Sequence, residues 1–278
     1  MHIGAAIFPT DYAIGVAELA RELESRGFES LFVTEHTHIP LSRRTPWPGG
    51  GPLPKEYSHT YDPFVALSFA AAATQTLKVG TGICLLPQRD AITTAKAVAS
   101  LDALSGGRFL MGLGAGWNQD EMENHGTVYA DRFAVLEEKI QAMRQIWTED
   151  AAAFHGRHVN FEPIWSYPKP TQRPHPPLFL GGESVHTMRR IVKYCDGWLP
   201  RGRHDYDVLA GMAQLHAVAK EHGRDPASLQ VTIFGARPDP DVIQSYRDGG
   251  VSRALFVLPS AGREEILPLL DSYAGFIN

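Results

Sequence analysis

The chain alternates between short apolar runs and amphipathic stretches, and this order occurs eight times. The apolar runs are short, rich in β-branched and aromatic residues and bounded by turn residues, as buried β-strands are. The stretches between them place apolar residues at helical spacing, as Val16, Ala20 and Leu23 do. The eight predicted strands lie at residues 2–8, 30–33, 77–86, 108–116, 177–182, 196–200, 229–235 and 253–259.

This alternation predicts a parallel sheet with right-handed crossovers, and eight units favour closure into an α/β fold of the (β/α)8 TIM-barrel type. The 278 residues are close to the roughly 250 that such a barrel needs, so we expect a single domain over residues 1–278. An open, doubly wound sheet is the alternative. It requires a glycine-rich cofactor turn after the first strand, and the segment AIFPTDY has no glycine cluster there.

Two segments depart from the repeat. The stretch from Leu41 to Tyr61, after the second strand, is rich in Pro, Gly and charge, so we expect a long surface loop that acts as a lid or binding loop. Residues 154–177 lie between the fourth helix and the fifth strand and read as an insertion with a hairpin and a proline-rich connection. Both departures leave the eightfold alternation intact.

Composition excludes several classes of partner. The chain has 26 Lys and Arg against 31 Asp and Glu, a net charge of −5, which predicts no binding to nucleic acid or to an anionic membrane. Its two cysteines, Cys84 and Cys195, are far apart in apolar segments and indicate neither a disulfide framework nor a zinc cluster. Without a signal peptide or a long apolar span, we expect a soluble, cytoplasmic protein with a small-molecule partner.

In a barrel of this type the active site gathers where the strands end, so the residues after each strand are the candidates. The fourth strand ends in the pattern Gly112-Leu-Gly114-Ala-Gly116. These glycines have two interpretations: tight packing between strand and helix, or a backbone that a planar ring approaches closely. The pattern lacks the spacing of a dinucleotide fingerprint, and it leaves both interpretations open.

The second strand ends in Glu35, His36 and His38. An H-x-H at a strand end is the spacing with which some barrel hydrolases hold zinc, but the later strands lack the remaining ligands, so we predict no metal. Without a metal, His36 is a candidate proton donor or acceptor beside Glu35. The alternative is a hydrogen-bonded loop histidine.

Gly181, Gly182, Glu183 and Ser184 lead directly into a helix that has Thr187 in its first turn. Free N–H groups, the helix dipole and two hydroxyls suit a phosphate, although an ordinary N-cap at Ser184 explains the pattern equally well. Arg132, after the fourth strand, is either a cationic contact for that phosphate or a solvated side chain.

Four segments together resemble the luciferase-like monooxygenase superfamily over nearly the whole chain: TEH (34–36), LKVGTGI (77–83), LSGGRFLMGLGAGWN (104–118) and PLFLGGES (177–184). EHTHIP and GAGWN are similar to its branch of F420-dependent oxidoreductases, common in mycobacteria and related actinobacteria. The resemblance implies a barrel that is usually a homodimer, with the cofactor ring across the strand ends and a cis peptide at Gly82–Ile83. The implied cofactor-binding residues are Phe8, His36, Thr81, Gly82, Ile83, Ala115, Gly116, Trp117, Arg132, Gly181, Gly182, Glu183, Ser184 and Thr187.

The chain departs from the family's deazaflavin sugar-phosphate dehydrogenases, which have glutamate where Trp117 lies and tryptophan where Pro40 lies, so their sugar substrate is not implied. The resulting hypothesis is hydride transfer between F420 and an organic substrate, with His36 supplying or stabilising a proton and Trp117 and Phe8 lining the substrate side. The alternatives are an FMN-dependent monooxygenase on the same barrel and a non-catalytic cofactor-binding protein.

Overall fold

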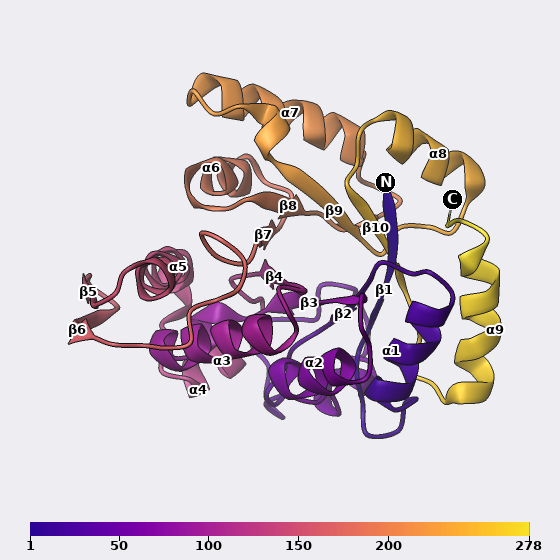
Figure 1. Cartoon of the computed structure of the whole chain (residues 1–278), viewed down its shortest axis with the longest axis horizontal. Coiled ribbons are helices and arrows are strands. Elements are labelled where there is room, and N and C mark those ends of the chain that lie inside the picture. The colour runs from indigo at the N-terminus through magenta and orange to yellow at the C-terminus, as the bar shows by residue number, and fades with distance from the viewer. Residues whose placement is uncertain (278) are drawn as a thin grey trace.

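The computed structural model describes residues 1–277, and its centre is a closed barrel of eight parallel strands (Figure 1). Around the barrel the strands follow the order β1, β10, β9, β8, β7, β4, β3, β2. The predicted (β/α)8 barrel is therefore confirmed. The strands are β1 (His2–Ile7), β2 (Ser30–Val33), β3 (Lys78–Cys84), β4 (Phe109–Leu113), β7 (Leu178–Gly181), β8 (Gly197–Leu199), β9 (Gln230–Phe234) and β10 (Arg253–Val257).

Helices connect consecutive strands and cover the outside of the barrel (Figure 1). Several begin where the sequence has an acid or hydroxyl N-cap: the Asp62 carboxylate accepts hydrogen bonds from the amides of Phe64 and Val65, with Pro63 at the first helical position. The helices are α1 (Val16–Ser25), α2 (Pro63–Ala72), α3 (Ala91–Leu104), α4 (Gln119–Asn124), α5 (Arg132–Thr148), α6 (Val185–Tyr194), α7 (Val208–Glu221), α8 (Pro240–Asp248) and α9 (Arg263–Ala274).

Large side chains fill the barrel interior, and small residues make room for them. Phe32 and Phe179 are fully buried inside the barrel. A Cβ at Gly80 would lie 2.7 Å from the Phe32 ring, so only glycine fits opposite that ring. A second, larger cluster of apolar residues packs between the strands and the helices, as expected for strands buried on both faces.

The two predicted departures from the repeat are present. The segment between β2 and α2 is irregular apart from a short 3-10 turn at Lys55–Ser58. The predicted hairpin is the antiparallel pair β5 (Ala152–His155) and β6 (Asn160–Ile164), which lies outside the barrel (Figure 1). Among residues 1–277 we find no helix with the length and hydropathy to span a membrane.

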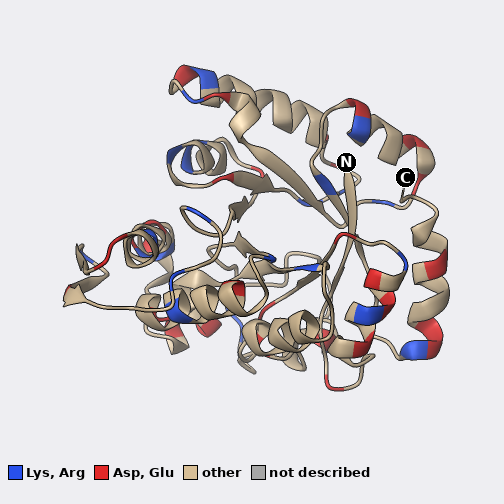
Figure 2. Ribbon diagram, viewed as in Figure 1, with Lys and Arg blue, Asp and Glu red and all other residues tan. Residues whose placement is uncertain are grey.

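Charged side chains gather at the end of the barrel where the strands begin. Arg253 is only 2 % exposed. Its guanidinium donates to both carboxylate oxygens of Glu29 at 2.6 Å, and Lys78 Nζ lies 2.9 Å from the same carboxylate. Burial raises the pKa of Glu29, but the hydrogen bonds and charge of Arg253 outweigh burial and lower it to about 2. On the surface nearby, α1 and α9 carry many of the acidic and basic residues seen in Figure 2.

Candidate active site

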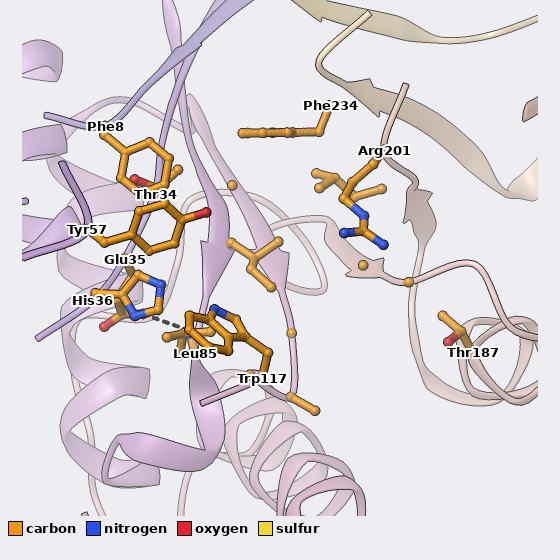
Figure 3. Close-up of a pocket in the computed structure, with 18 of the residues that line it drawn as sticks. Phe8, Thr34, Glu35, His36, Tyr57, Leu85, Trp117, Thr187, Arg201 and Phe234 are labelled. Carbon is orange, nitrogen blue, oxygen red and sulfur yellow. Dashed lines mark hydrogen bonds between the residues drawn. The ribbon is translucent and has the colours of Figure 1, made fainter. Parts of the chain in front are cut away.

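A pocket of about 400 Å³ opens where the strands end, within the range of small-molecule sites. Its wall combines residues from the ends of seven strands with residues of the loops that follow (Figure 3). The lining residues are Phe8, Thr34, Glu35, His36, Tyr57, Gly82, Ile83, Leu85, Gly114, Ala115, Gly116, Trp117, Phe133, Gly181, Gly182, Thr187, Leu199, Arg201 and Phe234. Figure 3 shows two ends, with His36, Tyr57 and Trp117 at one and Thr187 and Arg201 at the other.

His36 lines the first end and is held from behind by Glu121. Its Nδ1 atom lies 2.9 and 2.8 Å from the two carboxylate oxygens of Glu121. The Glu121 side chain is fully buried, and a buried carboxylate needs a donor, so Nδ1 carries a proton and donates it. Among residues 1–277 the Nε2 atom has no hydrogen-bond partner, which leaves it available to a ligand.

Aromatic rings surround His36. The Tyr57 ring lies 4.7 Å from that of Phe8 and 5.1 Å from the imidazole, between ring centroids. Trp117 meets the imidazole edge-on at 6.1 Å, and Trp47 packs on Tyr57 at 6.0 Å. Burial raises the pKa of Tyr57, so its hydroxyl stays protonated and neutral. These rings make an apolar chamber with His36 as its polar contact.

Glu35 lines the pocket beside His36 but makes no hydrogen bond with it. Its carboxylate accepts hydrogen bonds from the Leu85 amide at 2.6 Å and from Arg89, which also reaches Asp62. Burial raises the pKa of Glu35, and Arg89 opposes that shift. The physical reason is the alternation of side chains along extended backbone, which sends Glu35 and His36 to different sides.

The floor of the pocket is glycine-rich backbone. The Gly82–Ile83 peptide is cis, as the resemblance implied. A Cβ at Gly112 would lie 2.1 Å from the Thr81 carbonyl oxygen, so that glycine is explained by packing. Gly114 and Gly116 line the pocket, and Gly116 has φ +78°. Packing also bears on Gly114, where a Cβ would lie 1.8 Å from Ile83 Cδ1. The other interpretation, close approach of a planar ring to this backbone, stays a prediction.

The second end is built around the start of α6. Gly182 has φ +113°, which an L side chain rarely adopts, and a Cβ there would lie 2.9 Å from Thr187 Oγ1. Arg201 lies beside this end and makes a two-point contact with Glu183, Nε to Oε1 at 3.1 Å and Nη2 to Oε2 at 2.9 Å. Burial raises the pKa of Glu183, but Arg201 outweighs burial and holds it below its ordinary value.

Four of the predicted cofactor residues do not line the pocket. Thr81 is fully buried and donates to the Gly112 carbonyl, and Ser184 accepts from the Thr187 amide as an N-cap. Glu183 forms a two-point ion pair with Arg201, in which both carboxylate oxygens contact the guanidinium. Arg132 stacks on the Tyr129 ring at 3.9 Å and is not among the lining residues. The other ten predicted residues line the pocket together: Phe8, His36, Gly82, Ile83, Ala115, Gly116, Trp117, Gly181, Gly182 and Thr187.

Sequence reasoning missed Glu121, Tyr57 and Arg201. Glu121 lies in α4, whose six residues QDEMEN have no apolar periodicity, so neither the helix nor its contact with His36 was visible. Tyr57 lies in the short 3-10 turn at Lys55–Ser58 of the loop after β2, where the sequence carries no pattern that assigns a direction to a side chain. Arg201 carried a usable signal, because it follows a predicted strand directly. Within residues 1–277 no group of three or more His, Cys, Asp or Glu is arranged to hold a metal ion.

Comparisons with known proteins agree with this architecture. The family described as luciferase-like monooxygenase matches residues 7–238. An uncharacterized protein of Mycobacterium tuberculosis is 36% identical over 99% of this chain and 98% of its own length. An F420-dependent hydroxymycolic acid dehydrogenase of the same organism is 29% identical over 80% of this chain and 57% of its own. The crystal structure of the monooxygenase RslO1 from Streptomyces bottropensis has a TM-score of 0.80, 19% identity and coverage of 100% and 98% of the two chains.

Proposed function

The chain belongs to the luciferase-like monooxygenase family, and we propose that it is an F420-dependent oxidoreductase that transfers hydride between the deazaflavin and a small organic substrate. The observation that carries this proposal is one continuous pocket with different chemistry at its two ends. One end offers a histidine held by a buried carboxylate, and the other offers a glycine turn at a helix N-terminus. This combination suits a ligand with a reactive ring and a distant phosphate.

The lining residues fit such a ligand. The glycine backbone at Gly82, Gly114 and Gly116 leaves a side-chain-free floor for a flat ring. Gly181, Gly182 and Thr187 would hold the phosphate, because the first turn of α6 presents amide donors and the positive end of the helix dipole. When bound, the deazaflavin supplies a carbon that accepts or donates a hydride.

His36 would act on the substrate. Glu121 fixes the proton on Nδ1, so Nε2 is the atom that faces the chamber, and it would exchange a proton with an oxygen on the substrate. The Thr34 hydroxyl also lines the pocket, is buried and has no hydrogen-bond partner within residues 1–277. A substrate oxygen near both groups would satisfy them. Phe8, Tyr57 and Trp117 would exclude water from that oxygen.

The choice of F420 rests on two likenesses: the EHTHIP and GAGWN motifs, and the relative whose name states F420 dependence. An FMN-dependent monooxygenase is the second candidate, because the family contains monooxygenases and FMN also has a ring and a phosphate. A non-catalytic cofactor-binding protein is the third. It would retain the phosphate end without needing the contact between His36 and Glu121.

Titration of the purified protein with F420 and with FMN, followed by the absorbance and fluorescence of each chromophore, tests the cofactor. We expect saturable binding of F420 at micromolar concentration or below, on the order of −8 kcal/mol, and much weaker binding of FMN. Tight binding of FMN without binding of F420 would overturn the proposal in favour of the monooxygenase. A screen of metabolites with the F420-loaded protein then identifies the substrate by the change in deazaflavin absorbance.

A further inference from the structure

The short helix α4 carries Glu121, the carboxylate that holds His36. With six residues it is far shorter than the roughly 12 to 15 that an isolated helix needs even for marginal stability. The Asn118 side chain caps its start by accepting from the Glu121 amide at 3.4 Å, and Met122 is fully buried. The position of Glu121 therefore depends on the contacts that α4 makes with the rest of the protein.

Arg44, in the loop after β2, binds the outer side of α4. Its amide donates to Asp120 Oδ2 at 2.6 Å, and its Nε donates to Asp120 Oδ1 at 2.5 Å. Its Nη2 donates to Glu123. The Thr45 hydroxyl adds a further contact by accepting from the Gln119 amide at 3.3 Å. One arginine thus joins two carboxylates that lie three residues apart, on the same side of the helix.

Charge makes Arg44 important for α4. Among residues 1–277 it is the ion-pair partner of both Asp120 and Glu123, and without it these two carboxylates would repel each other. The hydrogen bonds from the amide and the guanidinium of Arg44 hold the pKa of Asp120 below its ordinary value. A single exposed ion pair usually contributes little, but this arginine adds a backbone donor and a second carboxylate.

The helix transmits this contact to the pocket. Asp120 and Glu121 are consecutive, so any displacement of one moves the backbone of the other. Consecutive side chains on a helix point about 100° apart, which lets Asp120 face Arg44 while Glu121 faces His36. The outer ion pair and the inner hydrogen bond therefore hold the same turn of α4 from two sides.

Two further contacts hold the other end of α4. Thr37 Oγ1 lies 2.7 Å from Nε2 of His125, which follows the helix, and His38 Nε2 lies 2.9 Å from Nδ2 of Asn124. These contacts lie about one turn beyond Glu121. They do not involve Arg44, so a variant at Arg44 should fold with α4 attached but with Glu121 held less firmly.

We propose that Arg44 is a positioning residue for His36. Through Asp120 and α4 it keeps the Glu121 carboxylate on Nδ1, and so leaves Nε2 free to exchange a proton with the substrate oxygen. When Nε2 has taken a proton, the same carboxylate stabilises the charged imidazole. The proton exchange rests on the proposed function, whereas the orientation of His36 is a property of the protein without cofactor.

The first test determines the tautomer of His36 in the protein without cofactor. Long-range 1H–15N correlation spectra at about pH 8, above the ordinary pKa of histidine, show which ring nitrogen carries the proton, and His36→Ala identifies the signals. We expect the Nδ1–H form alone in the unmodified protein. Arg44→Gln should move part of the population to the Nε2–H form. Arg44→Lys should move less of it, since an ammonium still binds one carboxylate.

The second test measures turnover with F420 and the substrate found by the metabolite screen. Arg44→Gln should lower kcat about threefold to tenfold, because a catalytic group that is held less firmly spends less time in the reactive geometry. Arg44→Lys should recover part of this loss. The dissociation constant for F420 should change by less than about twofold, since Arg44 does not line the pocket.

Arg43→Gln is the matched control. Arg43 is the adjacent arginine of the same loop, also exposed, and its side chain makes one hydrogen bond among residues 1–277, to the Pro40 carbonyl at 3.4 Å. This variant should keep the tautomer and the turnover of the unmodified protein.

Two outcomes would overturn the inference while leaving the proposed function intact. One is an unchanged tautomer in Arg44→Gln, even where the variant is less stable to urea, because Arg44 would then only stabilise the surface. The other is an equal change of tautomer in Arg43→Gln. If FMN binds and F420 does not, the proposed function fails, but a change of tautomer confined to the Arg44 variants would still support the positioning of His36.

Discussion

At the lower end of the barrel, where the strands begin, buried charge is fully paired; at the upper end, some polar atoms that line the pocket lack partners. Arg253 has Glu29 and Thr232, and the Arg108 guanidinium donates to four backbone carbonyls and a hydroxyl. At the upper end Thr34 Oγ1 has no partner within residues 1–277. His36 is hydrogen-bonded through Nδ1 alone among these residues. The barrel therefore satisfies its charges where it needs stability and leaves donors and acceptors unused where a ligand would sit.

The difference implies that substitutions at the two ends affect different measurements. A change at the lower end removes a partner from a buried charge, so its cost appears in the free energy of unfolding. A change at the upper end removes an atom that has no partner inside the protein, so its main cost appears in cofactor affinity or turnover. His36→Ala also leaves the buried Glu121 carboxylate without its donor, so this variant lowers the free energy of unfolding as well. Each prediction below tests one side of this separation.

The largest effect is expected at His36. His36→Ala should lower kcat about 10²-fold to 10⁴-fold, since it removes the proposed general acid or base. The dissociation constant for F420 should change by less than about threefold, because the phosphate end is untouched. The measurement is steady-state turnover with the substrate found by the metabolite screen, together with a fluorescence titration of the cofactor.

The matched control for this variant is His38→Ala. His38 is two residues away, but its Nε2 contacts Asn124 at 2.9 Å and it does not line the pocket. Turnover should therefore survive in His38→Ala. Equal turnover in His36→Ala and the unmodified protein would instead support the non-catalytic alternative.

At the lower end the largest effect is expected at Arg253. Arg253→Met leaves Glu29 buried with only Lys78 as a charged partner, so we expect a loss of about 3 kcal/mol or more in the free energy of unfolding. Urea unfolding measures this loss, and F420 affinity of the folded variant should stay unchanged. Arg263→Met, which breaks an exposed pair with Glu18, is the control and should shift the unfolding midpoint far less. Weakened cofactor binding in Arg253→Met would break the separation between the two ends.

The same lower-end pair predicts a dependence of stability on pH. The pKa of Glu29 is lowered to about 2, so its contribution is fully present above the ordinary value of 4.5 and is lost as the pH falls toward 2. This contribution is about 3 kcal/mol by linkage. Urea unfolding between pH 6 and pH 2 should therefore show a steeper decline for the unmodified protein than for Glu29→Gln. Parallel declines in the two proteins would show that another group controls acid unfolding.

Features formed by residues that are close together in the chain could be predicted from the sequence. Features that join residues far apart in the chain could not. The eight strands and the turn at Gly182 are local, because strand end, glycine and N-cap follow one another within a few residues. The contact between His36 and Glu121 joins residues 85 positions apart, and Tyr57 reaches the pocket from an irregular loop. Residue patterns have no means of predicting such contacts, which depend on how the loops pack after the barrel closes.

The smallest effect is expected at Gly182. This residue belongs to the part of the upper end that is formed by residues close together in the chain. Gly182→Ala places a Cβ about 2.9 Å from Thr187 Oγ1 on backbone with φ +113°, which should distort the turn that would hold the phosphate. We expect F420 affinity to fall about tenfold, or roughly 1.4 kcal/mol, with kcat at saturating cofactor nearly unchanged. Gly223→Ala is the matched control, since Gly223 also has a positive φ, +69°, but lies at the end of α7 with no atom within 4 Å of the added Cβ. Both variants should lose some stability from backbone strain. A loss of affinity confined to Gly182→Ala would therefore assign the phosphate to this turn. Equal affinity in the two variants would show that the phosphate does not bind at this turn.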